Sequence, residues 1–163
     1  MRRSKLDHVD LQILSDLQRD GRMTNVDLAR NAGISAPSCL RRLRTLEQSG
    51  LIQGYHAKMN GAALGYEVSF FALVGLDSQS EMVLQAFEED MGAWPEVREC
   101  HMARGSHDFV LRFVARNTQH ENELTQQLTS APHVVTVQTI QVIRTAKEET
   151  DVPIDPDAPI GSE

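Results

Sequence analysis

The feature that most constrains this 163-residue chain is the stretch at 35–50, SAPSCLRRLRTLEQSG. Ser35 suits a helix N-cap, Pro37 falls in the first turn, where a missing N–H is tolerated, and Gly50 is a typical helix stop. The apolar side chains repeat with the spacing of one helix face: Cys39, Leu43 and Leu46. The stretch therefore predicts a short capped helix, and places Cys39 in a core as a buried thiol rather than as a redox sensor.

The residues just before this helix indicate how it is held. In LARNAGIS, residues 28–35, the small residue Ala29 and the later Gly33 let one helix end and a second cross it closely. This is the pattern of a helix-turn-helix, whose second helix enters the DNA major groove. The predicted helix carries three outward cations: Arg41, Arg42 and Arg44. Arginine clusters are often only solvated, but these lie on the element that reads DNA, which favours DNA binding.

Charge divides the chain into two parts. Residues 1–60 carry ten Lys and Arg against six Asp and Glu, whereas residues 61–163 carry six against seventeen, within a total of −7. Only the N-terminal part is therefore expected to contact a polyanion, with double-stranded DNA as the partner. No apolar run approaches the ~20 residues of a membrane span, no signal segment is apparent, and two cysteines make no disulfide framework. We expect a cytoplasmic, nucleoid-associated protein with no membrane partner.

The N-terminal part, residues 1–60, is predicted to form three helices and a wing. The first is predicted at 8–19 after an N-cap at Asp7, and the second begins after Thr24 and stops at Gly33. The third is the basic helix. Residues 51–59 then suit an extended, wing-like ribbon that places Lys58 near the DNA backbone.

The C-terminal part alternates strand and helix. Apolar patterning predicts elements in the order βαββαβ: strand 68–76, helix 80–91, strand 97–103, strand 109–115, helix 121–128 and strand 134–143. This order gives an α+β, ferredoxin-like sandwich with a four-stranded antiparallel sheet and both helices on one face. Strand 68–76 is apolar on both faces. We therefore expect the sheet face without helices to bind a partner, most simply a second copy of this chain.

Three boundaries follow from composition. Glycines at 61 and 65 mark a hinge at 61–66, which leaves 67–147 as the second domain. Residues 148–163 hold six acidic residues and three of the six prolines, so they are expected to form a flexible acidic tail.

With both domains placed, the chain resembles the Lrp/AsnC (leucine-responsive/asparagine-sensing) family of bacterial and archaeal regulators. The similar stretches are LDHVDLQILSDLQRDGR (6–22), LARNAGIS (28–35), LRRLRTLEQSGLIQGYHA (40–57), ALG (63–65), PEVRECHMARGSHDFVLRF (95–113) and the end of the last strand through Lys147. The resemblance implies a winged helix-turn-helix followed by a ferredoxin-like ligand-sensing domain that pairs as a dimer, commonly assembled into tetramers or octamers. It implies a transcriptional regulator, with no catalytic residues and no cofactor, modulated by an amino acid.

The resemblance also implies where an effector binds. The family's G-x-x-D turn falls on Gly105 and Asp108, and the expected effector site comprises Arg104, Gly105, Ser106, His107 and Asp108. Arg104 stands where the family usually has a small hydroxyl residue, and Ser106 with His107 replaces a commonly acidic–aromatic pair. Arg104 can clamp a carboxylate bidentately or can be a solvated turn residue, and both interpretations stay open.

The predicted DNA contacts come from the basic helix and its surroundings. They are Ser35, Ser38, Arg41, Arg42, Arg44 and Lys58, with further phosphate contacts from Arg2, Arg3 and Lys5 and a thymine-methyl contact from Leu40.

Three alternatives belong to other classes of protein. Cys100, His101, His107 and Asp108 are metal-ligand types, but adjacent strand residues point to opposite faces, so Cys100 and His101 do not easily share a metal. The same architecture resembles decarboxylases of a siroheme-type tetrapyrrole, which keep histidines in this domain but have lost DNA binding. The intact basic helix argues against that enzyme. A non-specific architectural DNA-binding protein is the third alternative, and flat affinity across sequences would reveal it.

Overall fold

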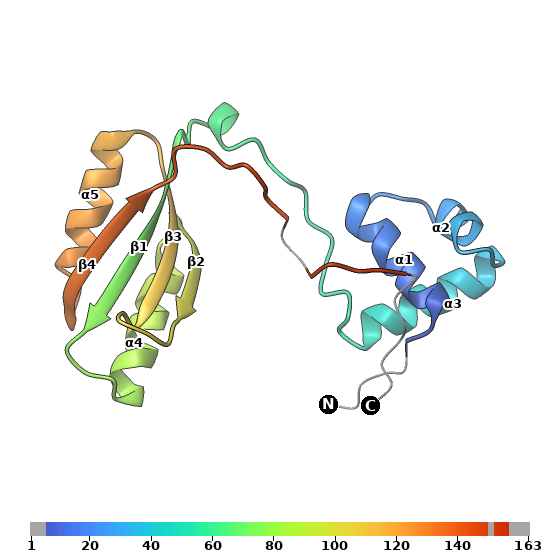
Figure 1. Cartoon of the computed structure of the whole chain (residues 1–163), viewed down its shortest axis with the longest axis horizontal. Helices are drawn as coiled ribbons and strands as arrows, with labels where there is room; N and C mark the ends of the chain where they lie inside the picture. The colour runs from blue at the N-terminus through green and yellow to red at the C-terminus, as the bar shows by residue number, and fades with distance from the viewer. Residues whose placement is uncertain (1–5, 150–151, 157–163) are drawn as a thin grey trace. The chain divides into compact units, whose positions relative to one another are not determined.

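The computed structural model describes residues 6–149 and 152–156. These residues form two compact units. The head unit comprises the described residues up to Lys58 together with those from Glu148 onward, and the body unit is Met59–Lys147. Figure 1 labels the helices and strands of each unit.

Three helices build the head unit, at the positions that the sequence predicts. They are α1 (His8–Arg19), α2 (Asn25–Asn31) and α3 (Ala36–Gln48). Asp7 and Asp10 form a reciprocal capping box at the start of α1, and the Thr24 hydroxyl accepts a hydrogen bond from the Asp27 N–H at the start of α2. The helices enclose a small core: Ile13, Leu28, Ala29, Cys39 and Leu46. Cys39 is fully buried, and desolvation raises the pKa of its thiol, as a core cysteine requires.

The wing is less regular than the sequence predicts. Among the described residues, none between α3 and the body unit is assigned to a strand, so the extended ribbon has no hydrogen-bonded strand pair. At the predicted hinge, a single 3₁₀ turn, η1 (Ala62–Leu64), ends at Gly65, whose φ of 85° is left-handed.

The body unit has the predicted βαββαβ order. Its elements are β1 (Val68–Leu76), α4 (Glu81–Ala93), β2 (Val97–Met102), β3 (Phe109–Ala115), α5 (Thr118–Thr129) and β4 (Val134–Gln141). The sheet order is β2-β3-β1-β4 with every pair antiparallel. The last strand ends two residues earlier than predicted, at Gln141 opposite Phe70, although the Val142 N–H still donates to the Ser69 carbonyl at 2.9 Å.

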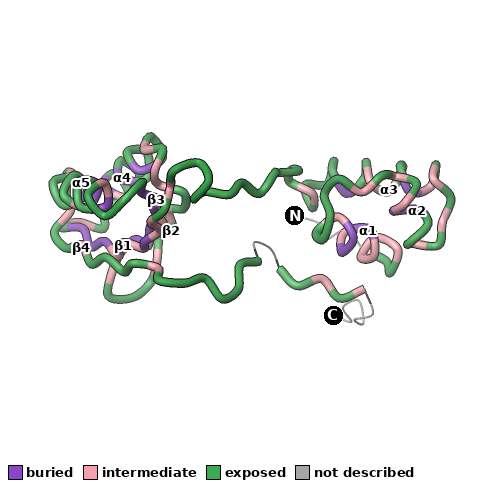
Figure 2. Tube along the Cα trace, turned by 90° about the horizontal axis from the view of Figure 1, so that it is seen from above, coloured by how far each residue is buried: buried purple, intermediate pink, exposed green. Residues whose placement is uncertain are grey.

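Helices α4 and α5 cover one face of this sheet, and the core lies between the layers (Figure 2). Alternate residues of β1 and β3 point into it, and Phe70 stacks on Phe113 with ring centroids 4.9 Å apart. The opposite face carries half-buried or exposed apolar side chains: Phe71, Leu73, Val110, Val114 and Ile140. Within the part of the chain that the structure describes, the prediction of a sheet with helices on one face and apolar side chains on the open face is confirmed.

Candidate nucleic-acid interface and effector turn

A tight turn sets the crossing of α2 and α3. Gly33 adopts a left-handed φ of 66°, and the Ile34 N–H donates to the Ala29 carbonyl, which closes a Schellman motif at the end of α2. The Asn25 side-chain amide donates to the Ala36 carbonyl at 2.9 Å, which ties the beginning of α2 to the beginning of α3. The turn therefore has the geometry of a helix-turn-helix, as predicted.

The outer face of α3 presents a row of polar and cationic side chains. Cys39 and Leu46 point into the core, while Arg41 and Arg44 are exposed and Leu40 is 38 % exposed. Ser35 is the N-cap residue, but its hydroxyl makes no capping hydrogen bond, so this hydroxyl stays available to a partner. Ser38, one turn before Arg42, is half-buried. The face can thus offer both guanidinium and hydroxyl donors to DNA.

Arg42 lies in a different environment from the other two arginines. Its Nη1 contacts a carboxylate oxygen of Asp7 and one of Asp10, both at 2.8 Å, at the N-terminal end of α1. Burial raises the pKa of Asp7, but the Asp10 backbone N–H and the Arg42 guanidinium together hold it below its ordinary value. Arg42 therefore ties α3 to the capping box of α1.

Two residues of the wing also have intramolecular partners. The Tyr55 hydroxyl donates to Glu47 Oε1 at 2.9 Å, and burial together with this carboxylate raises the pKa of Tyr55 to about 12. Lys58 forms an ion pair with Glu148, with 2.7 Å between Nζ and Oε2. The additional predicted phosphate contacts at Arg2, Arg3 and Lys5 lie outside the described residues.

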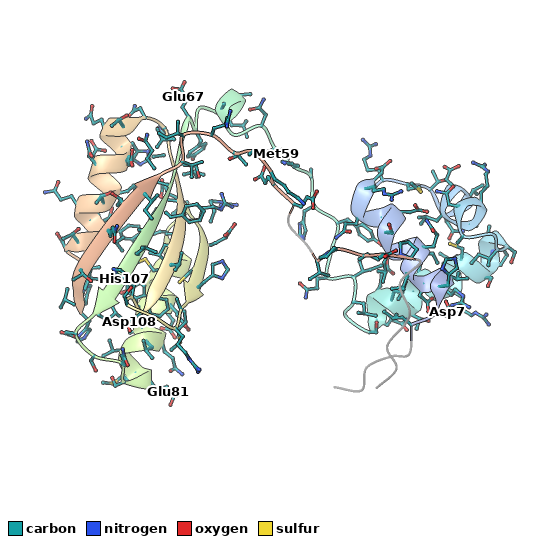
Figure 3. All side chains as sticks on the ribbon, in the orientation of Figure 1. Asp7, Met59, Glu67, Glu81, His107 and Asp108 are labelled. Carbon is teal, nitrogen blue, oxygen red and sulfur yellow. The ribbon has the colours of Figure 1, made fainter. Side chains whose placement is uncertain are left out.

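The predicted effector turn joins β2 to β3, and Asp108 organises it. The Asp108 carboxylate accepts from the Leu76 N–H at 2.8 Å and from the Gln79 side-chain amide at 2.9 Å. Its backbone N–H donates to the Val74 carbonyl, and its carbonyl accepts from the Ala103 N–H, each at 2.8 Å. Figure 3 labels His107 and Asp108 in this turn. Asp108 thus anchors the turn to the end of β1, which gives it a structural role within one chain.

The rest of the turn is open. Arg104, Gly105 and Ser106 are exposed, and His107 is half-buried with its Nδ1 3.0 Å from the Ser106 hydroxyl. A Cβ added at Gly105 meets no atom within 4 Å, and the Gly105 backbone is not left-handed. Nothing in the described chain therefore requires a glycine at 105, and the space beside it is open.

Sequence reasoning missed three partners in these sites. Asp7 and Asp10 lie more than thirty positions before Arg42, and Gln79 lies 29 positions before Asp108. Asp7 was identified only as a helix cap. No local pattern in the sequence signals such long-range pairs.

Other chemistries find little support in the residues that the structure describes. No group of three or more His, Cys, Asp or Glu there is placed to hold a metal ion. Cys100 is half-buried, and burial raises the pKa of its thiol. His101 lies 3.4 Å from Glu99, which also pairs with Arg112. Within the same described ranges, no helix has the length and apolar character needed to cross a membrane.

A helix-turn-helix head and a separate α+β body with an exposed turn define a DNA-binding regulator with a ligand-sensing domain. Residues 6–53 match the winged helix-turn-helix DNA-binding family, and residues 69–152 match the Lrp/AsnC ligand binding domain. The chain belongs to the Lrp/AsnC family of transcriptional regulators, which confirms the resemblance seen in the sequence.

Named relatives agree with this assignment. The chain is 46 % identical to the leucine-responsive regulatory protein of Rhizobium meliloti, over 93 % of this chain and 98 % of the relative. It is 34 % identical to the transcriptional regulator AzlB of Bacillus subtilis, over 92 % and 96 % respectively. A solved structure of a Neisseria meningitidis transcriptional regulator in complex with L-methionine superposes with a TM-score of 0.87 at 28 % identity, over 92 % of this chain and 97 % of that one. The relatives are regulators, so the family is a non-enzymatic one.

Proposed function

We propose that this regulator recognises operator DNA through the exposed face of α3 and acts in the cytoplasm at the nucleoid. Its proposed DNA-binding residues are Ser35, Ser38, Arg41, Arg42, Arg44 and Lys58. The observation that carries the proposal is the exposure of Arg41 and Arg44 on the second helix of the turn. Bidentate guanidinium contacts to guanine specify sequence, whereas contacts to phosphate position the protein. Arg42 contributes mainly by orienting α3 against α1, because its guanidinium already binds two carboxylates.

The test compares binding to a duplex selected from a random-sequence pool with binding to an unselected duplex. Replacing Arg41 or Arg44 by alanine is expected to cost about 1–3 kcal/mol on the selected duplex if it reads a base, and to relax specificity there. Arg98→Ala, an exposed arginine on β2 of the body unit, removes the same charge away from the helix-turn-helix and serves as the matched control. Unchanged affinity for the selected duplex in the Arg41→Ala, Arg44→Ala double variant would contradict the proposed interface.

We further propose that the turn at Arg104, Gly105, Ser106, His107 and Asp108 binds an amino acid. An amino acid presents a carboxylate and an ammonium close together, and the turn offers an exposed guanidinium and backbone N–H groups for the carboxylate and the Asp108 carboxylate for the ammonium. A Mycobacterium tuberculosis feast-or-famine regulatory protein, 26 % identical over 92 % of this chain, was also solved with L-methionine. Together with the Neisseria complex, this supports an amino-acid effector here.

Calorimetric titration of the twenty amino acids tests this site. Arg104→Gln removes the proposed carboxylate clamp while keeping a long polar side chain, and is expected to weaken a hit by about 1.5–3 kcal/mol, the value of a hydrogen bond to a charged group. Arg98→Gln is the control. A hit untouched by Arg104→Gln and Asp108→Asn places the ligand elsewhere, and the absence of any hit at millimolar concentration counts against amino-acid sensing.

Self-association is the remaining part of the proposal. The uncovered apolar sheet face of the body unit, residues Phe71, Leu73, Val110, Val114 and Ile140, supports a dimer paired through this face, with tetramers or octamers built from dimers. Light scattering is expected to show a dimer for the wild-type protein and a monomer for Phe71→Asp. A monomeric wild-type protein at micromolar concentration would contradict pairing altogether.

A further inference from the structure

An extended segment near the C-terminus lies along α1 of the head unit. At one end, the Gln18 side-chain amide donates to the Val152 carbonyl at 2.9 Å, and at the other, His8 Nδ1 lies 2.7 Å from the Pro156 carbonyl. Because a carbonyl oxygen only accepts, this ring nitrogen must carry the proton. Figure 1 draws the segment in dark red where it reaches α1. Both ends of residues 152–156 are therefore held by side chains of one helix.

The lengths of the two partners match. His8 and Gln18 are ten residues apart, which is about 15 Å along a helix at 1.5 Å per residue. Val152 and Pro156 are four residues apart, which is about 13 Å in an extended chain at ~3.3 Å per residue. Since Gln18 binds the first of these residues and His8 the last, the segment runs antiparallel to α1 along most of its length.

The sequence of the segment favours this extended shape. Pro153 and Pro156 have a fixed φ, and each pushes the residue before it towards extended backbone. Less conformational entropy is then lost when the segment binds the helix. Exposure also varies along it, with Ile154 and Pro156 half-buried while Val152, Pro153 and Asp155 are exposed. These features are those of a bound extended segment rather than of an unattached tail.

The segment brings negative charge to the DNA-binding head. Glu148 pairs with Lys58, a residue proposed above to contact phosphate. Residues 1–58 carry ten Lys and Arg against six Asp and Glu, a net charge of +4. Of the described residues near the C-terminus that belong to the head unit, 148–149 and 152–156, three are acidic and none is Lys or Arg, so they lower the net charge of the head. The head therefore attracts DNA phosphates less strongly than residues 1–58 alone would.

We propose that residues 148–149 and 152–156 act as an intramolecular strap, in which residues 152–156 bind α1 and Glu148 competes with DNA phosphates for Lys58, thereby restraining DNA affinity. The inference rests on the proposed DNA contact of Lys58. The occupant of the α1 surface is the chain's own segment, whose ends are held by His8 and Gln18. Releasing the strap frees Lys58 and removes acidic side chains from the head, so binding to DNA tightens.

The first test measures affinity for an unselected duplex of random sequence, because phosphate contacts do not depend on sequence. Glu148→Gln in the full-length protein is expected to tighten binding by about 1.4- to 5-fold per head, the range of an exposed ion pair worth 0.2–1 kcal/mol. Glu67→Gln removes the same charge from an exposed residue of the body unit and is the matched control. In a Lys58→Ala background, Glu148→Gln is expected to give no gain.

The second test separates docking of the strap from its charge. Replacing His8 and Gln18 together by alanine removes both hydrogen bonds to the strap and changes no acidic residue, and is expected to tighten DNA binding. A chain ending at Lys147 is expected to bind more tightly still. Adding a synthetic peptide of residues 148–163 to that shortened chain should weaken its binding again, in proportion to peptide concentration.

Several outcomes would overturn the strap while leaving the proposed interface intact. One such outcome is that Lys58→Ala weakens binding while Glu148→Gln leaves it unchanged or changes it only as much as Glu67→Gln does. The strap would also be refuted if Glu148→Gln still raised DNA affinity in the Lys58→Ala background. It would be refuted likewise if the chain ending at Lys147 bound DNA no more tightly than the full-length chain. If Arg41→Ala, Arg44→Ala and Lys58→Ala all leave DNA binding unchanged, the proposed interface itself fails.

Discussion

Arg41 and Arg42 are neighbours in sequence, but their surroundings predict opposite consequences when each is replaced. Arg41 is exposed on the outer face of α3, whereas the Arg42 side chain is 30 % exposed and binds Asp7 and Asp10. Methionine keeps a long unbranched side chain and removes only the guanidinium. We expect Arg42→Met to destabilise the head unit with a small effect on DNA affinity. We expect Arg41→Met to weaken DNA binding with little effect on the stability of the head unit.

The size of the stability effect follows from the contacts of the guanidinium. Hydrogen bonds to charged groups contribute about 1.5–3 kcal/mol, and exposed ion pairs about 0.2–1 kcal/mol. The Asp10 side chain is 15 % exposed and that of Asp7 is 51 % exposed, so the Asp10 contact should count for more. Arg42 Nε is buried without a hydrogen-bond partner, and removing it relieves about 1 kcal/mol of desolvation. The net cost expected for Arg42→Met is about 1–2 kcal/mol.

Hydrogen exchange followed by mass spectrometry measures this cost in the full-length protein, because it reports each segment separately. Peptides from α1 and α3 should exchange about 5- to 30-fold faster in Arg42→Met, the factor that corresponds to 1–2 kcal/mol. The same peptides in Arg41→Met should change by no more than the ±0.5 kcal/mol typical of surface substitutions. Fluorescence of Trp94, the only tryptophan in the chain, serves as a control for the body unit.

Equal protection of the head peptides in the two variants would refute the assigned role of Arg42. So would a loss of DNA affinity in Arg42→Met as large as that in Arg41→Met, once the fraction of folded head is taken into account.

Three further outcomes are expected. The ultraviolet absorbance of Tyr55, obtained by subtracting a titration of Tyr55→Phe, should change near pH 12, and Glu47→Gln should lower the pH of that midpoint. The folded pKa of Tyr55 is raised from 10 to about 12. The stability that its contact with Glu47 contributes is therefore present below pH 10 and is lost as the pH rises towards 12. Because the folded pKa of Asp7 is lowered, its stabilisation is present above about pH 4 and is lost as the pH falls further, so the protection factors of amides at the start of α1, taken relative to intrinsic exchange at the same pH, should fall in acid. Phe113→Ala should destabilise the body by about 3–5 kcal/mol, read from Trp94 fluorescence, since Phe113 is fully buried, stacked on another ring and 6.2 Å from the Trp94 ring centroid.

Local sequence patterns predicted most of the secondary structure and the family. The predicted bounds of α1, β1 and β3 coincide with those observed. Helix α1 begins where Asp7 caps it, and the two strands are apolar runs bounded by polar or turn-forming residues. Caps, turns and hydrophobic periodicity act between residues a few positions apart, so they are visible in the sequence itself. The same reasoning located Gly33 and Gly50, whose left-handed φ angles end α2 and α3.

Tertiary structure decided which of these residues already have partners within the chain. Arg41, Arg42 and Arg44 look alike in the sequence, yet only Arg42 meets the two carboxylates that begin α1. Asp108 appeared as a ligand group, and the fold also gives it the Leu76 N–H and the Gln79 amide. Such contacts join residues about 30 positions apart or more, because packing brings them together after the local elements have formed.

The C-terminal segment shows the same division most clearly. Its acidic and proline-rich composition indicated that it has too little apolar surface to form a core of its own. Composition does not reveal that another part of the chain provides the missing partner. Here that partner is α1, whose His8 and Gln18 are spaced to hold the Pro156 and Val152 carbonyls of an extended segment. Residues 152–156 are thus held by hydrogen bonds to a helix more than 130 residues away, and only the three-dimensional structure brings the two together.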